Sequence, residues 1–317
     1  MSQLPVFNAS SQLQQLTDVL DEALDLLKGK NPVMEQNHVS EAIPSSLFEQ
    51  CIELCQQGVK EVEPIRTIHH LSCTGGTLIT KCLAAMPNVT VLNEVDPLST
   101  MLFKPEKPDF TPTDMLALLR QGNQQVSDEL LTQLFLQNVE LVAKELTLAG
   151  KHLLLRDHSH SHFFMGTEVG DRKTVLSMID EQFPTLSIIT VRNPIDSYLS
   201  LDAQGWRTFQ PFNIDEYCKR YMLFLDAHEG LPIFKYETLV YEPGKTMKQM
   251  CDLLRIKFSE TFSETFDVFK FSGDSGRTGN MIEPRPRRTY DASIKTEIAA
   301  SGHYRSLINR LGYEAIY

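Results

Sequence analysis

The sequence lacks the features that define several common classes of protein. No stretch approaches the ~18 to 20 consecutive apolar residues of a transmembrane helix, and no apolar segment of the signal-peptide type is present near the N-terminus. Basic residues are in the minority, since 30 Lys and Arg stand against 41 Asp and Glu and the net charge is −11. We therefore expect a cytoplasmic protein with no membrane span, and no broad binding of nucleic acid or anionic membranes, which need a basic surface.

Cysteine signatures are missing as well. The six cysteines are scattered along the chain, at positions 51, 55, 73, 82, 218 and 251. No Cys-x-x-Cys pair suggests a zinc site, and no spacing suggests a disulfide framework. Reduced thiols are the expected state in a cytosolic protein.

Three histidines stand at alternating positions, His158, His160 and His162. They would share one face if the strand before them continued, and they would then be able to bind a metal. No carboxylate or cysteine with metal-ligand spacing supports that interpretation, so no metal site is predicted. A single histidine acting as a base or a substrate contact is preferred, and a polar loop without a special role is the remaining alternative.

What the chain does contain is an alternation of strand-like and helix-like segments. Five short strands are predicted, over residues 65–71, 89–92, 152–155, 186–191 and 232–237, and one last helix is predicted over about 292–311. Strands that alternate with helices predict an α/β domain over 61–317, in which a central parallel sheet of about five strands has helices on both faces. Residues 1–60 form a predicted helical N-terminal appendage, for which packing or dimerisation, and hence an oligomer, is the expected role.

The segment from Ile65 to Met86 organises this domain. It is typical of a strand, a Gly75-Gly76 turn and a helix that Pro87 ends. A glycine turn before a helix presents free backbone N–H groups and the positive end of the helix dipole, which together favour a phosphate or a sulfate. The nucleotide-triphosphatase loop is excluded, because no Gly-Lys-Ser/Thr follows the required four-residue spacer. The pattern therefore predicts a P-loop-like site for another kind of nucleotide.

A second group of candidate residues follows the predicted strand 186–191. Arg192 lies at the tip of that strand, Asn193 is suited to cap the next helix, and Pro194 is suited to its first turn. Ser200 lies about two turns into the same helix.

A glycine-rich loop, residues 272–280, lies in the most basic short stretch of the chain. Three arginines follow it, at positions 285, 287 and 288. Guanidinium groups pair well with phosphate, so one interpretation is a loop that closes over a doubly anionic ligand. The other interpretation is an ordinary solvated turn.

These segments together resemble the sulfotransferases that use 3′-phosphoadenosine-5′-phosphosulfate (PAPS). The Cys73-Thr74-Gly75-Gly76-Thr77-Leu78 turn resembles their 5′-phosphosulfate loop, and Arg192-Asn193-Pro194-x-Asp196-x-x-x-Ser200 resembles their 3′-phosphate motif. The segment 234–243 and the Gly276-Arg277-Thr278-Gly279 loop are similar to later parts of the family. The matches follow the expected order over about residues 65 to 280.

The resemblance implies a sulfotransferase of the bacterial or cytosolic type, which moves a sulfuryl group in line from PAPS to a hydroxyl or an amine and leaves 3′-phosphoadenosine-5′-phosphate (PAP). The implied nucleotide ligands are Thr74, Gly75, Gly76, Thr77, Leu78, Arg192, Ser200, Arg277, Thr278 and Gly279. No metal is required by this scheme. The acceptor is a small molecule, a saccharide or a peptide, and loops such as 94–112, 158–172 and 202–213 would build its pocket.

Two residues are candidates for the base that deprotonates the acceptor. Glu94 follows the second predicted strand, as the catalytic glutamate does in tyrosylprotein-type and several bacterial sulfotransferases. His158 follows the third strand, and so resembles the catalytic histidine of cytosolic small-molecule sulfotransferases. Either residue can act if its pKa is tuned toward neutrality, and Glu94 is preferred.

Cys73 departs from the family pattern, which usually has Lys or Arg at this position. A missing donor to the transferring group costs on the order of 2.7 to 4 kcal/mol, about two to three decades in rate, unless another residue replaces it. The candidate replacements are His70, Lys81, Arg156 and the arginines at 285–288. The alternative function is a catalytically altered nucleotide-binding or interaction protein on the same fold. A small-molecule kinase is disfavoured by the absent Gly-Lys-Ser/Thr.

Overall fold

The computed structural model describes residues 62–101, 110–273 and 281–315. Those from Glu63 onward belong to one compact unit. The predicted appendage over 1–60 lies outside the described residues, and so do Arg277, Thr278 and Gly279. Within the described ranges, no helix combines the length and the apolar character needed to span a bilayer.

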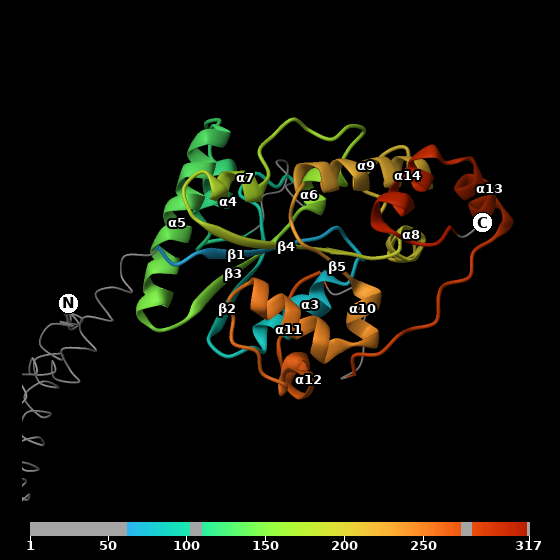
Figure 1. Cartoon of the computed structure of the whole chain (residues 1–317). Helices are drawn as coiled ribbons and strands as arrows, with labels where there is room; N and C mark the ends of the chain where they lie inside the picture. The colour runs from blue at the N-terminus through green and yellow to red at the C-terminus, as the bar shows by residue number, and fades with distance from the viewer. Residues whose placement is uncertain (1–61, 102–109, 274–280, 316–317) are drawn as a thin grey trace, which may run out of the picture. The chain divides into compact units, whose positions relative to one another are not determined.

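A parallel sheet forms the centre of the described domain (Figure 1). Its five strands are β1 (Ile65–His69), β2 (Val89–Val95), β3 (His152–Asp157), β4 (Thr185–Val191) and β5 (Ile233–Lys235). The strand order is β2-β3-β1-β4-β5, and each neighbouring pair is parallel. The strands that follow β1 in the chain lie on both sides of it. The carboxyl end of β1 therefore lies at the topological switch point, where ligands bind in α/β sheets. The predicted α/β fold class is confirmed.

One face of the sheet is covered by the helices that follow β1 and β5 (Figure 1). These helices are α3 (Gly76–Ala84), α10 (Tyr236–Tyr241), α11 (Pro243–Leu253), α12 (Phe262–Thr265) and the short 3₁₀-helix η1 (Phe266–Val268). Ile68, Leu154 and Ile188 point from the strands into the core on this side. Leu239, Met247 and Met250 of α10 and α11 belong to the same fully buried cluster.

The opposite face is covered by two further cores, because neighbouring residues of a strand point to opposite sides. Its helices are α4 (Met115–Arg120), α5 (Asp128–Leu148), α6 (His160–Phe163), α7 (Val175–Asp180), α8 (Pro194–Ala203), α9 (Ile214–Ala227), α13 (Ala292–Ala300) and α14 (Gly302–Leu311). Leu153 and Leu155 pack in a cluster with α5 and α7. Ile189 and Val191 pack in a second cluster with α8, α9 and α14. Strands buried on both faces explain the nearly continuous apolar runs in the sequence.

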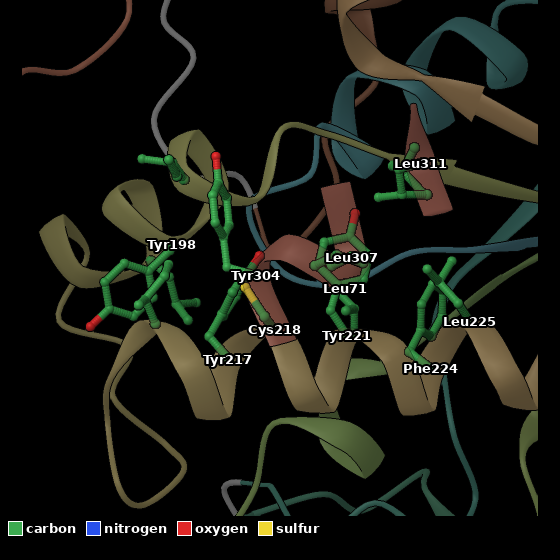
Figure 2. Packing of buried hydrophobic residues seen from close by; sticks show 14 of the residues in the cluster. Leu71, Tyr198, Tyr217, Cys218, Tyr221, Phe224, Leu225, Tyr304, Leu307 and Leu311 are labelled. Atoms are coloured by element: carbon green, nitrogen blue, oxygen red, sulfur yellow. The ribbon is translucent and has the colours of Figure 1, made fainter. Parts of the chain in front are cut away.

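The aromatic face of α9 holds the start of α8 in place (Figure 2). Tyr217 and Tyr221 are completely buried among residues of α8 and α14. The Tyr217 hydroxyl donates to Ser197 Oγ at 2.8 Å, and the Tyr221 hydroxyl accepts from the backbone N–H of Arg192 at 3.2 Å. The core therefore fixes the strand tip from which the Arg192 side chain extends.

Several predicted element boundaries are wrong. The first strand ends at His69 rather than at 71, and the second and third continue to Val95 and Asp157 rather than ending at 92 and 155, so Glu94 lies within β2. The single helix expected over 292–311 is two helices, since the Ser301 backbone is extended and its side chain accepts from Tyr304 N to begin α14. The fifth strand ends at Lys235 rather than at Glu237, because α10 begins at Tyr236. Local capping and tertiary contacts decide the break at Ser301 and the end of β5, and the apolar pattern of the sequence does not indicate either of them.

Arg220 provides a test of the packing between α9 and the segment after α6. Its guanidinium is fully buried and donates to the backbone oxygens of Phe163, Met165 and Gly166 at 2.9–3.0 Å, and to Glu216 at 2.7 Å. We expect Arg220→Met to lower the free energy of unfolding by on the order of 3 kcal/mol, because it leaves these acceptors without their charged donor. Urea unfolding followed by circular dichroism measures the change.

The matched control is Arg207→Met, which removes an arginine whose side chain is 60% exposed and paired with Asp202. Exposed pairs contribute less than about 1 kcal/mol, so this variant should unfold close to wild type. Equal losses in the two variants would contradict the assignment of Arg220 to the core.

Candidate functional site

A cavity of about 720 Å³ lies at the carboxyl ends of the sheet strands. It is lined by residues at or just after the carboxyl ends of four different strands, including His70, Glu94, Arg156 and Arg192. Pockets of about 300–1,000 Å³ are the usual size for a small-molecule or cofactor site. The cavity therefore lies where the switch-point rule expects a ligand.

The charge of the cavity is opposite to the charge of the protein. Arg156, Arg192, Arg285 and Arg288 line it, and Glu94 is the single carboxylate among its described lining residues. A concave site with an excess of positive charge concentrates anions even in a protein of net charge −11. The favoured ligand is anionic.

The glycine turn after β1 is shaped by two side chains that approach its backbone. Gly75 has φ +90°, and a Cβ there would lie 2.2 Å from Cδ2 of Tyr236. A Cβ on Gly76 would lie 2.1 Å from Nε2 of His70. The conformation and the lack of space both require glycine at this turn.

Helix α3 presents its N-terminus to the cavity. The first hydrogen bond within it runs from Ile79 N to Gly75 O, so the N–H groups of Gly76, Thr77 and Leu78 precede the helical ladder. No acidic residue lies in the first turn to neutralise the helix dipole. These three residues line the cavity, and their N–H groups with the dipole are suited to hold an anion.

The two threonines of the turn have different positions. Thr77 lines the cavity, and its hydroxyl accepts from Arg156 Nη2 at 3.0 Å and donates to Gly273 O at 2.9 Å. Thr74 is completely buried, and its hydroxyl donates to Leu71 O at 2.7 Å. The Thr74 hydroxyl therefore closes the turn from inside, and the role of Thr74 as a nucleotide ligand stays a prediction.

Arg156 is the cation that lies against the first turn of α3, directly after the glycine turn. It projects from β3, is 2% exposed, and donates from Nε to His70 Nε2 at 2.8 Å. Its two other nitrogens reach Asn93 Oδ1 at 2.7 Å and Thr77 Oγ1 at 3.0 Å. Glu94 Oε1 lies 3.4 Å from Nη2. One guanidinium thus connects the carboxyl ends of β1, β2 and β3 to the first turn of α3.

The other candidates for the cation missing at Cys73 are placed less well. Burial and the Arg156 charge lower the pKa of His70 to about 3, so its ring is neutral and donates from Nδ1 to Leu71 O. Lys81 lies on α3 and does not line the cavity. Burial raises the pKa of the Cys73 thiol to about 12, so Cys73 supplies no charge of its own. Arg285 and Arg288 line the cavity, whereas Arg287 pairs with Asp196 at 3.0 Å.

Arg192 and Ser200 lie together beside the same turn. Arg192 Nη1 donates to Cys73 O at 3.0 Å and lies 3.4 Å from Ser200 Oγ, and its guanidinium stands over the Tyr236 ring, 5.0 Å from the centroid. Both residues line the cavity. Asn193 caps α8 with its side chain, as its sequence position indicates, and Glu237 accepts from its backbone N–H at 2.8 Å.

Glu94 reaches the cavity through an irregularity in β2. The register with β3 shifts between Leu92 and Val95, and Glu94 has φ +57°, which is uncommon for a residue with a side chain. Its carboxylate is 15% exposed and accepts from the Ser272 hydroxyl. Such local strain is found at functional sites, where neighbouring contacts hold it in place.

The three histidines after β3 do not share one face. The strand ends at Asp157 and α6 begins at His160, so the alternation required for a common face is lost. His158 and His160 line the cavity with their ring centroids 4.0 Å apart, whereas His162 contacts Gly170 O at 2.9 Å. Burial lowers the pKa of His158, although Glu94 opposes this shift, so the ring is neutral near neutral pH.

Of the predicted glycine-rich loop, Ser272 and Gly273 are described. Both line the cavity, and the Ser272 carbonyl accepts from Arg156 Nη1 at 3.2 Å. Gly273 has φ +72°, and a Cβ there would lie 2.2 Å from Glu94 Oε1. This segment therefore packs against the glycine turn and Glu94.

Several site residues were missed or misjudged from sequence. Tyr236 and Ser272 were not singled out as ligands, and Arg156 was named only as one of several replacements. A signal was present, since Arg156 follows an apolar strand just as Arg192 does. Of the aromatic residues in the loop before α9, Trp206 lines the cavity while Phe209 is fully buried in the core.

Comparisons with known proteins find distant structural similarity. No protein-family model matches the chain, and no curated protein sequence matches it. A sulfotransferase domain from the curacin biosynthetic pathway aligns over 81% of this chain and 100% of its own, with 15% identity and a TM-score of 0.46. A sulfotransferase from Alicyclobacillus acidocaldarius aligns over 80% and 98%, with 13% identity and a TM-score of 0.42. Mouse sulfotransferase SULT7A1, solved with PAP, aligns over 78% and 89%, with 10% identity and a TM-score of 0.40.

Proposed function

We propose that the cavity binds PAPS and that the protein transfers its sulfuryl group to a hydroxyl or amine acceptor. The observation that carries the proposal is the meeting of two anion-binding groups at one cavity. The N-terminus of α3 with Arg156 forms one of them, and Arg192 with Ser200 forms the other. PAPS has two separate anionic groups, the 5′-phosphosulfate and the 3′-phosphate, and this pair of sites is complementary to them.

The 5′-phosphosulfate is assigned to the turn and α3. The N–H groups of Gly76, Thr77 and Leu78 lie at the positive end of the α3 dipole, which favours an anion, and these residues line the cavity. Arg156 already donates to the Thr77 hydroxyl, so its guanidinium lies beside these N–H groups. In the sulfotransferases that the sequence resembles, a Lys or Arg usually stands at the position of Cys73. We assign the role of that missing cation to Arg156.

The 3′-phosphate is assigned to Arg192 and Ser200. A charged guanidinium and a hydroxyl 3.4 Å apart can donate to one phosphate together. Arg285 and Arg288 line the cavity as well and add positive charge to it. A nucleotide without a 3′-phosphate would leave the Arg192–Ser200 pair without its anion, which is the basis for distinguishing PAPS from ATP.

The bound nucleotide would supply the sulfuryl group, which passes in line to the acceptor while the bridging oxygen keeps the electron pair of the broken bond. Negative charge therefore grows on that oxygen. Arg156 and the N–H groups of the α3 N-terminus are fixed donors placed to stabilise this charge without reorganisation. Buried contacts with His70 and Asn93 hold the guanidinium in position.

Removal of the proton from the acceptor is assigned to His158, and Glu94 is assigned as the carboxylate partner of its ring. The ring of His158 is neutral because burial lowers its pKa, so it has a lone pair available for a proton. Glu94 offers a ligand oxygen within 4.8 Å of the imidazole, and its charge favours the imidazolium that would form. Glu94 itself is held by Arg156 and Ser272, which makes it less suited than His158 to be the primary base.

The first prediction from this proposal concerns nucleotide binding. PAP should bind to the purified full-length protein, and Arg192→Ala should weaken binding about 10- to 100-fold, because one charge-assisted contact with the 3′-phosphate is lost. Adenosine 5′-phosphate should bind wild type and Arg192→Ala with similar affinity. Isothermal calorimetry with Arg207→Ala as a control makes the comparison; absent binding of PAP, or no effect of Arg192→Ala, would refute the proposal.

The role of Arg156 gives a second prediction. Arg156→Met should reduce transfer of labelled sulfate from PAPS by about 10²- to 10³-fold, the usual effect of removing one fixed donor. Adding Cys73→Arg to this variant should restore part of the activity, since a cation returns to the turn. Lys81→Met is the matched control and should transfer at the wild-type rate to an acceptor found by a library screen. No recovery in the double variant, with Lys81→Met equally impaired, would contradict the assignment.

The pH dependence of transfer tests the base. His158 acts as a base only when neutral, so activity should fall as the pH drops through its pKa, which burial places below the ordinary value of 6.5. His158→Gln should lower the rate by about 10²- to 10⁴-fold and remove this acid limb. Glu94→Gln should move the acid limb to lower pH. If instead Glu94→Gln removes the limb while His158→Gln keeps it, Glu94 is the base.

A further inference from the structure

A second cluster of titratable side chains is buried behind the cavity and has no part in the proposed transfer. His69 lies at the end of β1, Asp157 at the end of β3, and His228 directly after α9. The exposed fractions of their side chains are 0%, 4% and 0%. One atom from each, His69 Nδ1, Asp157 Oδ2 and His228 Nε2, lies within 4.8 Å of the other two.

The hydrogen bonds of the two rings determine which nitrogen atoms hold protons. His228 Nδ1 contacts Phe224 O at 2.8 Å, and a carbonyl only accepts, so Nδ1 is protonated. The Thr67 hydroxyl donates its proton to Ser187 Oγ, so its contact of 2.7 Å with His69 Nε2 is one in which Nε2 donates. With these tautomers both neutral rings turn an unprotonated nitrogen toward the Asp157 carboxylate. His69 Nδ1 lies only 2.8 Å from Asp157 Oδ2, so a proton or a cation must lie between these two atoms.

Three Lewis bases, the two ring nitrogens and the Asp157 carboxylate, therefore lie close together in a region buried from solvent. His228 Nε2 lies 3.9 Å from Asp157 Oδ2, is buried, and has no hydrogen-bond partner among the described residues. A lone pair that faces a carboxylate without a positive charge between them is unfavourable in a buried environment. The Ser159 hydroxyl donates to Asp157 Oδ2 at 2.6 Å, but the rings of Phe163 and Phe224 beside His228 offer its Nε2 no polar contact.

We propose that His69, Asp157 and His228 bind a divalent transition metal, with zinc as the favoured ion. Two imidazoles and a carboxylate form a zinc ligand set, and the outward N–H of each ring donates to an oxygen, as metal-bound histidines do. Donors bound at about 2.0–2.1 Å in tetrahedral geometry lie about 3.3 Å apart. The two separations from Asp157 Oδ2, 2.8 and 3.9 Å, lie on either side of that value.

The position gives the metal a structural role. It would tie the ends of β1 and β3 to the end of α9, and Asp157 stands in the chain between Arg156 and His158. A fixed Asp157 would therefore position both neighbours at the cavity. Among the described residues, the other cluster of this kind is Glu94, His158 and His160. It is less suited to a cation, because the Arg156 guanidinium lies 3.4 Å from Glu94.

The experiment is elemental analysis of the full-length protein, expressed with added zinc and purified without a metal-affinity tag. About one zinc per chain is expected, and cobalt substitution should give visible absorption bands from the bound ion. His228→Gln should remove both signals. Thr67→Val, which removes the acceptor for His69 Nε2, should weaken zinc affinity about 10- to 100-fold.

The matched control is His303→Gln, since His303 Nδ1 also lies 2.8 Å from a carboxylate, Asp215, but on the surface. That variant and His160→Gln should keep the zinc. Wild-type protein without stoichiometric zinc would overturn the proposal and leave a proton shared between His69 and Asp157. Zinc that His160→Gln removes and His228→Gln retains would overturn it as well. These readouts do not depend on PAPS, so failure here is distinct from failure of the proposed transfer.

Discussion

The buried guanidinium of Arg156 is the interaction on which the candidate site depends. It contacts a residue after β1, two residues of β2, the first turn of α3 and the Ser272 carbonyl. A charge that is 2% exposed is unfavourable unless its donors are satisfied and a carboxylate lies nearby. Asn93, Thr77 and Glu94 meet these conditions. The same contacts that make the buried charge tolerable also fix its direction, so stability and positioning have one origin.

The sequence was sufficient for the architecture because the architecture depends on local patterns. Apolar runs such as Leu186–Val191 predicted strands buried on both faces, and the Gly75-Gly76 pair located the turn before α3. Asn193 and Pro194 located the start of α8. Periodicity and capping depend on neighbours in the chain, and that information is present in a single sequence.

The site was only partly predictable, because contacts between distant segments decide it. Cys73 appeared to leave the turn without a cation, and nothing near it in sequence showed that Arg156, on another strand, lies there. Thr74 matched a motif, yet its hydroxyl faces the core. The histidine alternation failed because β3 ends at Asp157, and α6 then changes the period. In each case the residue type was visible and its direction was set by tertiary packing.

The carboxyl ends of the strands explain why both the cavity residues and the buried cluster of His69, Asp157 and His228 lie at one edge of the sheet. Parallel strands leave their last carbonyl and N–H groups without a ladder partner there, so polar side chains must satisfy them and one another. Asp157 faces the buried histidines while its neighbours Arg156 and His158 line the cavity. Successive residues at the end of a strand point to opposite sides. Arg156, Asp157 and His158 therefore contribute both to the buried histidine cluster and to the cavity. A change at the cluster of His69, Asp157 and His228 can therefore reach the cavity through the backbone on either side of Asp157, and also from His69 to its neighbour His70, which lines the cavity.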